Sequence, residues 1–332
     1  KKMKTAIAIL NWNGEKLLPQ FLPSVINNSK NATIYIIDNA STDNSIELLK
    51  TQFPSVKIIQ NKGNYGFAQG YNEGLKHIDA EYFCLLNSDV EVTENWIDPI
   101  EKLFDNVPEI AAIQPKILDY KNKQYFEYAG AGGGFIDKFG YPFCRGRVFS
   151  TLEKDNGQYN DTTQIFWATG ASLFIRKKDF FEQNGFDEEF FAHMEEIDLC
   201  WRLNNAGRKI YYCGESTVYH LGGATLDKAN PKKWYLNYRN SLWMMLKNLP
   251  SNKLFPMIFT RLSMDGIAAI AFLPKQGFPH VWAVFISHMH FYRGFFKIYK
   301  KRQQNQIKNY SDKDLLPFQY FIQKRQYFKD LN

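Results

Sequence analysis

Short apolar runs alternate with helix-like segments through the first 90 residues of the chain. The runs cover residues 5–10, 33–37, 56–60 and 82–86. Each of the first three is followed by polar or glycine-rich residues and then by an amphipathic stretch, as expected for a buried strand, a loop and a helix. Strands that alternate with helices are typical of a parallel sheet covered by helices on both faces. This part is therefore predicted to be an α/β domain.

The next residues predict smaller elements. These are irregular loops and hairpins over 124–149, a strand over 164–176 containing Gly170, a helix over 195–205, and a strand pair at 209–213 and 216–220. From Pro231 the composition changes to long amphipathic or apolar stretches. We expect one domain over 1–230, with halves 1–120 and 121–230, and a helical extension over 231–332.

Charge and cysteine content exclude several classes of protein. Hydrophobic residues make up 45% and charged residues 23% of the chain, which excludes a disordered or collagen-like protein. Lys and Arg outnumber Asp and Glu by 41 to 34, and the whole excess lies in residues 293–332. A basic tail behind a neutral body argues against a nucleic acid and favours an anionic surface as partner. The four cysteines form no CxxC pair, so we expect free thiols.

Polar side chains follow the predicted strands at the edge where open α/β sheets bind ligands. They are Asn11, Asp38, Asn39, Asn87 and Asp89. Asn and Asp also favour turns and helix caps, which is the alternative for any one of them. Because every strand-end loop carries such residues, together they indicate a binding site.

No GxGxxG fingerprint follows the first strand and no GxxxxGK[ST] loop occurs, which disfavours a dehydrogenase or a P-loop kinase. Residues 61–70 do hold three glycines before a helix, including Gly66, next to Asn64. Exposed amides at such a helix start could accept an anion. A simple turn is the equally weighted alternative.

Two acidic motifs carry candidate chemistry. Asn87-Ser88-Asp89 resembles the DxD signature of nucleotide-sugar transferases, where an oxygen ligand holds a divalent cation against a diphosphate. Residues 190–202 place three carboxylates at a predicted helix start. There Glu195, Asp198 and Arg202 share a face suited to ion pairs. Glu196 has no partner on that face, and we expect it to be ionised at neutral pH, as a general base must be.

With both motifs given, the chain resembles an inverting family 2 glycosyltransferase of the GT-A fold, close to the rhamnosyltransferase-like members that decorate bacterial surface polysaccharides. Seven segments carry the resemblance in order: IAILNWNG, YIIDNASTDNS, NKGNYGFAQGYNEG, LLNSDV, WATGASLFIRK, GFDEEFFAHMEEIDLCWRLNNAG and VYHLGG. It implies a Rossmann-like, mostly parallel sheet flanked by helices, with a nucleotide-sugar-binding half over 1–120 and an acceptor and catalytic half over 121–230.

The resemblance also implies roles for single residues. Asp38 would hold the nucleotide base, Asp89 would reach the metal and the diphosphate, and His220 would complete the shell of Mn²⁺ or Mg²⁺. In the family a Glu-Asp pair, the ED motif, stands where this chain has Glu195-Glu196. Its second acid would be the catalytic base, here Glu196, with Glu195 as runner-up. The remaining expected donor contacts are Asn11, Asn39, Asn64, Gly66, Asn87 and Ser88. Gly170, Asp198 and Arg202 are expected to contact the acceptor or to give structural support.

This chain departs from the family pattern at two positions. Asn87 stands in the first acidic position of the DxD motif, and Glu196 stands where the family usually has Asp. A catalytically impaired sugar-nucleotide-binding or scaffold protein is the alternative that these departures leave open. A nucleotidyltransferase is disfavoured because no basic glycine-rich loop follows the first strand. We expect His193 to be a surface or hydrogen-bonded residue and Met194 to pack in the core.

The extension combines apolar residues with interleaved basic and aromatic side chains. The basic ones are Arg293, Lys297, Lys300, Lys301 and Arg302. Charges and prolines interrupt the apolar stretches, which disfavours a span and suits a helix at an anionic membrane surface. A helical subdomain packed on the catalytic domain or on a second subunit is the alternative. The apolar stretch near the N-terminus is too short for a secretory signal. We expect a cytoplasmic enzyme, peripheral on the membrane, with a glycan or lipid-linked acceptor.

Overall fold

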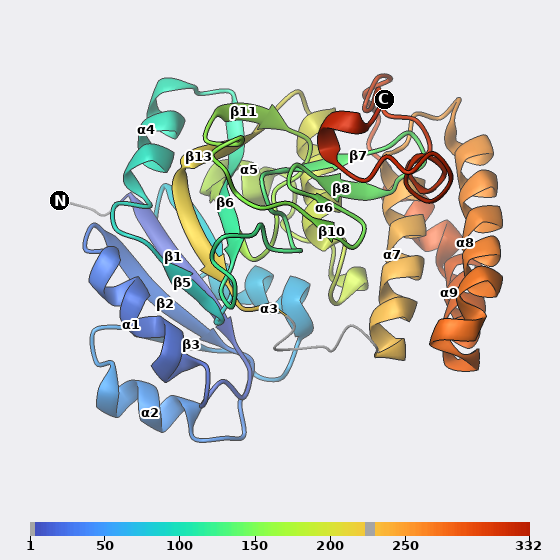
Figure 1. Cartoon of the computed structure of the whole chain (residues 1–332). Coiled ribbons are helices and arrows are strands. Elements are labelled where there is room, and N and C mark those ends of the chain that lie inside the picture. The colour runs from blue at the N-terminus through green and yellow to red at the C-terminus, as the bar shows by residue number, and fades with distance from the viewer. Residues whose placement is uncertain (1–3, 223–229) are drawn as a thin grey trace.

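The computed structural model describes residues 4–222 and 230–332 and contains one large mixed sheet (Figure 1). Its strands follow the order β11-β13-β6-β12-β4-β1-β2-β3, and β5 pairs with β13. Their bounds are β1 Thr5–Asn11, β2 Ala32–Asp38, β3 Lys57–Gln60, β4 Tyr82–Leu86, β5 Val90–Val92, β6 Ile110–Asp119, β11 Thr162–Ile165, β12 Ser172–Arg176 and β13 Lys209–His220. The predicted α/β architecture is confirmed.

The first four strands are parallel, with β1 between β2 and β4. Their apolar side chains are buried on both faces because helices cover both sides. One face is covered by α1 Leu18–Asn28, α2 Ser45–Gln52 and α4 Asp98–Asn106. The other is covered by α3 Gly66–Leu75, α5 Lys177–Glu182, α6 Glu195–Asn205 and α7 Pro231–Asn248. All four cysteines are buried free thiols, as predicted.

Two strand predictions are wrong in detail. Residues 164–176 form two strands, β11 and β12, joined by a turn that contains Gly170. A side chain at Gly170 would come within 2.9 Å of the Phe67 ring, so glycine lets the turn pack closely on α3. Residues 209–220 form one strand, β13, instead of a pair. An irregularity between Cys213 and Thr217 shifts its register with β6 and gave the sequence its apparent break.

A small second sheet of four short strands lies beside the large one, in the order β10-β9-β8-β7. Its strands are β7 Gly134–Ile136, β8 Pro142–Cys144, β9 Arg147–Val148 and β10 Thr151–Leu152. The end of the chain packs on it through Leu316, Tyr320 and Leu331. The single-turn helices are η1 Glu188–Phe190, η2 Phe318–Ile322 and η3 Phe328–Asp330. The C-terminal tail is thereby held against the body that the first half of the chain builds.

Three long helices make up most of the extension: α7, α8 Leu254–Gln276 and α9 Phe278–Tyr299 (Figure 1, orange). Residues 242–246 of α7 are buried in the same core as α6. Helices α8 and α9 form an antiparallel hairpin that packs against this core through Leu254, Ile258, Phe291 and Ile298. Helical structure here is as predicted. The division of the chain at residue 230 stays a prediction, and α7 shows that packing continues across it.

Candidate functional site

Parallel pairing of β1 with β2 places Asn11 directly opposite Asp38 at the ends of both strands. Asn11 donates from Nδ2 to Oδ1 of Asp38 at 2.9 Å, and both residues are buried. Ser41 donates its hydroxyl to Asp38 Oδ1 at 2.6 Å and its amide to Oδ2 at 3.0 Å. Within the described residues Oδ1 of Asn11 has no partner, which leaves a buried acceptor beside Asp38.

Asn39, Asn64 and Gly66 build the start of α3. Asn39 donates to the Gly66 carbonyl at 2.8 Å and accepts from Asn61 at 2.8 Å. The Gly66 amide donates to Asn64 at 3.1 Å, and the next two amides donate to the Phe191 carbonyl at 2.9 and 3.3 Å. Gly66 has a φ of 70°, which favours glycine. Because these amides already have protein acceptors, the structure favours the turn over the anion site at this helix start.

The end of β13 brings His220 against the residues that follow β4. Its Nε2 lies 3.2 Å from Oδ1 of Asp89 and 3.4 Å from Nδ2 of Asn87, and Ser88 lies between these two, partly exposed. Its Nδ1 lies 3.1 Å from Oε2 of Glu127. Asp89, His220 and Glu127 are all buried. Two carboxylates thus flank one imidazole at the edge of the sheet.

Burial lowers the pKa of His220, but hydrogen bonds to and charges on Asp89 and Glu127 outweigh it and raise the pKa to about 10. The imidazole is therefore protonated at neutral pH when no metal is bound. No group of three or more acidic, histidine or cysteine side chains within residues 4–222 and 230–332 is arranged to hold a metal ion. Asp89 and His220 do offer carboxylate and imidazole donors suited to Mn²⁺, provided that the metal displaces the imidazole proton.

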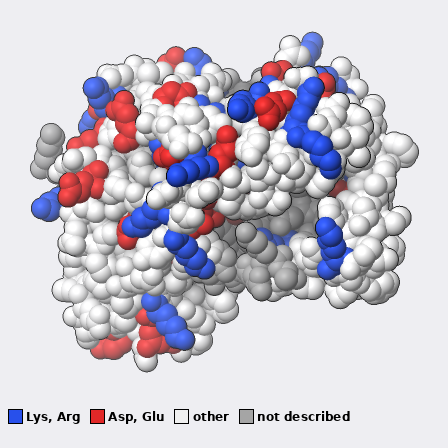
Figure 2. Space-filling model, in the orientation of Figure 1, with Lys and Arg blue, Asp and Glu red and all other residues white. Residues whose placement is uncertain are grey.

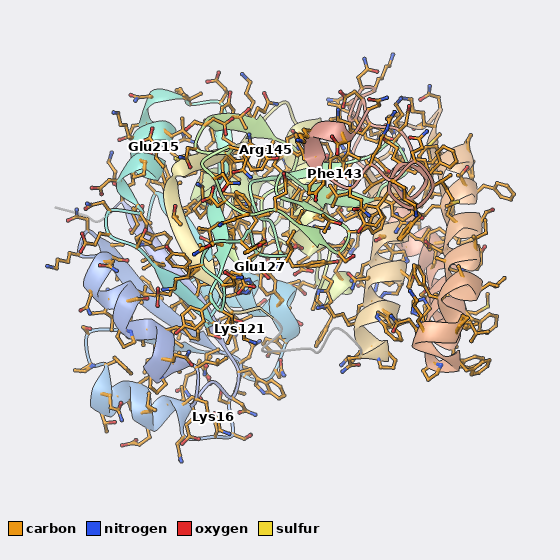
Figure 3. All side chains as sticks on the ribbon, viewed as in Figure 1. Lys16, Lys121, Glu127, Phe143, Arg145 and Glu215 are labelled. Atoms are coloured by element: carbon orange, nitrogen blue, oxygen red, sulfur yellow. The ribbon has the colours of Figure 1, made fainter. Side chains whose placement is uncertain are left out.

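Glu127 was missed by the sequence analysis. It lies in the glycine-rich stretch 124–149, which matches no motif and reads as loops. Its Oε2 accepts from the Ala129 amide at 2.6 Å, which fixes the carboxylate beside His220. Figure 3 labels Glu127, which lies in the middle of that view. A carboxylate that orients a metal-binding histidine is a common supporting contact. The one signal for Glu127 in the sequence is that it is an acidic residue within a stretch of glycines and aromatics. Gly222 and Gly223 directly follow His220, and the sequence predicts that this pair lets backbone approach a diphosphate. Gly223 lies outside the described residues.

Glu195 and Glu196 begin α6, directly after a strained segment. Phe191, His193 and Met194 have φ values of 62°, 71° and 71°, which cost free energy in residues other than glycine. Strained backbone of this kind clusters at active sites. His193 is partly buried, and Met194 packs against the core as predicted.

Asn240 of α7 holds this segment in place. Its Nδ2 lies 3.0, 2.9 and 2.7 Å from the carbonyls of Phe190, Ala192 and His193. The side chain is fully buried, so no solvent competes for these contacts. A residue of the C-terminal extension therefore positions the start of α6. Nothing in the sequence singles out Asn240, because its partners lie about 50 residues away.

The environment of the two glutamates differs from expectation. Burial raises the pKa of Glu196 to about 7, although hydrogen bonds from the backbone act against it. Burial and the charges of Glu196 and Asp198 raise the pKa of Glu195 well above its usual range. Among the described residues Oε2 of each has no hydrogen-bond partner. Burial thus opposes the expected ionisation of Glu196 at neutral pH, and a raised pKa of this size suits a base that works near pH 7.

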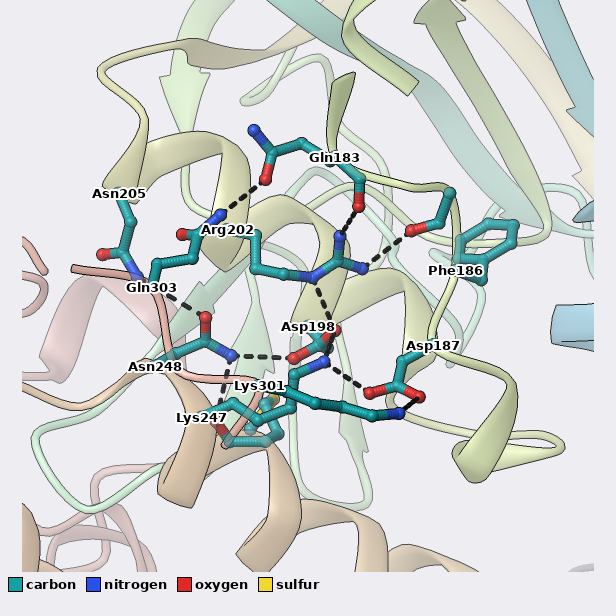
Figure 4. A network of polar contacts seen from close by, with 12 residues as sticks. Gln183, Phe186, Asp187, Asp198, Arg202, Asn205, Lys247, Asn248, Lys301 and Gln303 are labelled. Atoms are coloured by element: carbon teal, nitrogen blue, oxygen red, sulfur yellow. Dashed lines mark hydrogen bonds and ion pairs between the residues drawn. The ribbon is translucent and has the colours of Figure 1, made fainter. Parts of the chain in front are cut away.

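Asp198 and Arg202 form the ion pair predicted from their spacing, at 2.8 Å between Oδ2 and Nε. Figure 4 shows the network around them. Lys247 of α7 bridges Asp198 and Asp187 at 2.7 and 2.8 Å, and Asn248 donates to Asp198 at 2.8 Å. Burial opposes ionisation of Asp187, but Lys247 and Lys301 hold its pKa well below the usual range. This network joins α6 to α7, a supporting role.

Known glycosyltransferases resemble this chain in sequence and in fold. A rhamnosyltransferase from Mycobacterium tuberculosis, N-acetylglucosaminyl-diphospho-decaprenol L-rhamnosyltransferase, is 25% identical over 219 residues, which are 61% of this chain and 71% of that protein. The rhamnosyltransferase WbbL of Escherichia coli is 27% identical over 165 residues, 45% of this chain and 58% of WbbL. The structure of GalNAc-T7 with UDP, GalNAc and Mn²⁺ superposes with a TM-score of 0.57 at 17% identity, covering 76% of this chain and 49% of that one.

GalNAc-T7 and this chain share a fold. The model of glycosyl transferase family 2 matches residues 6–180, more than half of the chain. The resemblance on which the sequence analysis relied is therefore confirmed, and the chain belongs to glycosyl transferase family 2.

Proposed function

We propose that the chain transfers a sugar from a nucleoside diphosphate sugar to a lipid-linked glycan acceptor, with inversion at the anomeric carbon, at the cytoplasmic face of a membrane. Family membership supports the reaction class. The name of the mycobacterial relative, which acts on a diphospho-decaprenol-linked sugar, supports the acceptor class. Two observations carry the proposal: the strand ends bring Asp89 to His220, and the described residues leave Oε2 of Glu196, at the start of α6, buried without a hydrogen-bond partner.

The nucleotide base lies at Asp38 in this proposal. Asp38 is fixed by Asn11 and Ser41, and Asn11 offers a buried oxygen with no partner among the described residues. A pyrimidine or purine ring with an N–H group would satisfy that oxygen. A buried acceptor left without a donor costs about 1–3 kcal/mol, so filling it contributes to nucleotide affinity.

Asp89 and His220 would hold Mn²⁺ or Mg²⁺, with Glu127 orienting the imidazole. When bound, the metal neutralises the charge that develops on the departing diphosphate. Asp89 and Asn87 orient the diphosphate from the end of β4. Placing these groups before the reaction avoids reorganisation as the leaving charge forms.

Glu196 accepts the proton of the acceptor hydroxyl as that oxygen attacks the anomeric carbon. The new C–O bond forms on the face opposite the diphosphate, whose bond to the sugar breaks with the electron pair remaining on the phosphate oxygen. Attack opposite the leaving group inverts the anomeric configuration. Asn240 acts as a positioning residue, because it holds the backbone just before Glu195 and Glu196.

The raised pKa of Glu196 predicts a pH dependence of kcat/KM. A base works only when deprotonated, so activity should rise with pH through about 7 and level off above it. The measurement is initial rate at low acceptor concentration between pH 5 and 9. In Glu196→Asp, whose side chain is shorter and whose pKa is set by a different environment, the midpoint should move. A rate that is flat from pH 5 to 9 would argue against this base.

Separate roles for the strand ends predict separable binding losses. Asp89→Ala and His220→Ala should weaken donor binding in the presence of Mn²⁺ and leave metal-free binding of the nucleoside diphosphate nearly unchanged. Asp38→Ala should weaken nucleotide binding with or without metal. Thermal unfolding at increasing nucleotide concentration measures all three, because a ligand raises the melting temperature by mass action.

Equal losses in all three variants with and without Mn²⁺ would contradict this division. The same assay with a panel of nucleotide sugars identifies the donor. Transfer to a polyprenyl-diphosphate-linked sugar, followed by mass spectrometry of the product, then tests the proposed function itself. Donor binding without any product would favour the impaired-enzyme alternative.

A further inference from the structure

The outer side of the α8–α9 hairpin is a wide apolar surface. On α9 the exposed apolar side chains alternate at spacings of four and three residues: Phe278, Trp282, Phe285, Met289, Tyr292, Phe296 and Tyr299, each at least 41% exposed. On α8 they are Phe255, Phe259, Ile267, Ile270 and Leu273, each at least 42% exposed. We call these twelve side chains the hairpin face. Aromatic side chains carry about 150–250 Å² each, so the face leaves roughly 1,000 Å² in contact with water.

An apolar surface of this size needs a partner, because the largest patch on a typical monomer is about 300–600 Å². In Figure 2 uncharged residues cover most of this side of the molecule. Over residues 254–299 one acidic residue occurs, Asp265, and it is buried against Arg261. The exposed charges there, Lys275, Arg293 and Lys297, are all basic. The hairpin therefore offers apolar and aromatic side chains with a basic rim, which complements an anionic lipid surface.

The inner side of α8 explains why the hairpin would lie on a membrane and not cross it. Among the described residues α8 is the one helix long and apolar enough to cross, with a mean hydropathy of 1.4. Its Arg261, however, donates to the Gly140 carbonyl at 3.0 Å and stacks 3.8 Å from the Tyr141 ring. These contacts fix one side of α8 to the catalytic domain, so only the opposite side is available to lipid.

The basic residues of the tail differ in role from the sequence prediction. Lys297 pairs with Glu189, and Lys301 donates to Asp187 at 2.6 Å. Arg302 donates to backbone carbonyls at the end of α7. Three of the five basic residues expected at a membrane thus stabilise contacts within the protein. Arg293 and Lys300 are the two that remain exposed with no such contact among the described residues.

The hairpin also reaches the segment before the glutamates through α7. His280, in the first turn of α9, packs on the rings of Trp234 and Tyr238, at 4.6 and 5.8 Å. Lys232 at the start of α7 lies 5.3 Å from the Phe191 ring, in the strained segment. An attachment of the hairpin face to a membrane would therefore hold the catalytic side of α7 at a fixed place near the lipid.

We propose that the hairpin face is the membrane-binding surface of this enzyme, with α8 and α9 lying in the interface of an anionic phospholipid bilayer. Its purpose rests on the proposed function, since a lipid-linked acceptor has to be met where its lipid is. The binding of the hairpin face to a membrane does not depend on the proposed function, because the apolar area and the charge pattern exist whether or not the acceptor is lipid-linked.

Flotation with vesicles of phosphatidylglycerol and phosphatidylethanolamine tests the proposal. The intact protein should float, and a variant with Phe259, Ile270, Phe278 and Phe296 all changed to Ser should lose at least tenfold in partitioning. Tyr125→Ser, which removes an exposed aromatic from the catalytic domain, is the matched control and should float like the intact protein. Arg293→Gln and Lys300→Gln should each reduce binding about fivefold on anionic vesicles and hardly at all on neutral ones.

A second measurement needs no multiple variant. Brominated lipids should quench the fluorescence of the intact protein, and Trp282→Phe should remove much of that quenching. Failure of the intact protein to float, or quenching unchanged by Trp282→Phe, would overturn the proposal. The proposal would also be overturned if the intact protein does not bind vesicles and is a dimer in solution, and if the serine variant is a monomer. None of these readouts involves transfer, so they fail independently of the proposed function.

Discussion

Replacing Glu196 with Gln should lower kcat about 10²- to 10⁴-fold while donor binding stays near that of the unchanged enzyme. The amide keeps the size of the carboxylate but cannot accept a proton. Oε2 of Glu196 makes no hydrogen bond within the described chain, so the substitution breaks no contact of that atom. Single-turnover transfer measures the rate, and thermal unfolding with donor present measures binding.

Glu195→Gln is the matched control because it changes the neighbouring buried carboxylate by the same atoms. Burial and the charge of Glu196 disfavour the ionised form of Glu195, so a neutral amide changes the charge there little. The variant should therefore keep most of the rate and a pH profile like that of the unchanged enzyme. Turnover close to that of the unchanged enzyme in Glu196→Gln, together with a large loss in Glu195→Gln, would move the catalytic role to Glu195.

Local pattern was sufficient to predict the parallel half of the sheet and the residues at its edge. The apolar runs of β1 and β4 are uninterrupted, since these strands are buried on both faces, and polar residues begin where they end. The pairing of Asn11 with Asp38 follows from the register of β1 and β2, and that of Asp89 with His220 from the place where β13 ends. Motifs in order were enough to identify the family.

Contacts between distant segments could not be read from the sequence. Asn240 stabilises a backbone about 50 residues earlier, and Glu127 meets His220 from a stretch with no motif. The ionisation of Glu196 depends on burial, which spacing on a helix does not report. The same limit applies to the tail. Lys301 and Arg302 look like surface charges in the sequence, yet Lys301 binds Asp187 and Arg302 binds two backbone carbonyls at the end of α7.

Asp198→Ala is expected to have the largest effect on stability. Asp198 is fully buried, and it is bound by Arg202 at 2.8 Å, by Lys247 at 2.7 Å and by Asn248 at 2.8 Å. Removing it leaves two buried cations with less compensation, a change that typically costs about 3–5 kcal/mol. Chemical denaturation should show this loss as a lower midpoint with an unchanged slope.

Lys76→Ala is the matched control, because it breaks an exposed ion pair with Glu73 whose side chains are 55% and 38% exposed. Solvent screens such a pair, so the midpoint should hardly move. The Asp198 network joins α6, which carries both glutamates, to α7, which carries Asn240. At denaturant concentrations below its unfolding midpoint, where the variant is still folded, Asp198→Ala should therefore also have a lower transfer rate, because the strained segment is held less firmly. An unchanged midpoint in Asp198→Ala would contradict this prediction. It would show that Asp187 alone compensates the charge of Lys247 and that the stability of the fold does not depend on the Asp198 network.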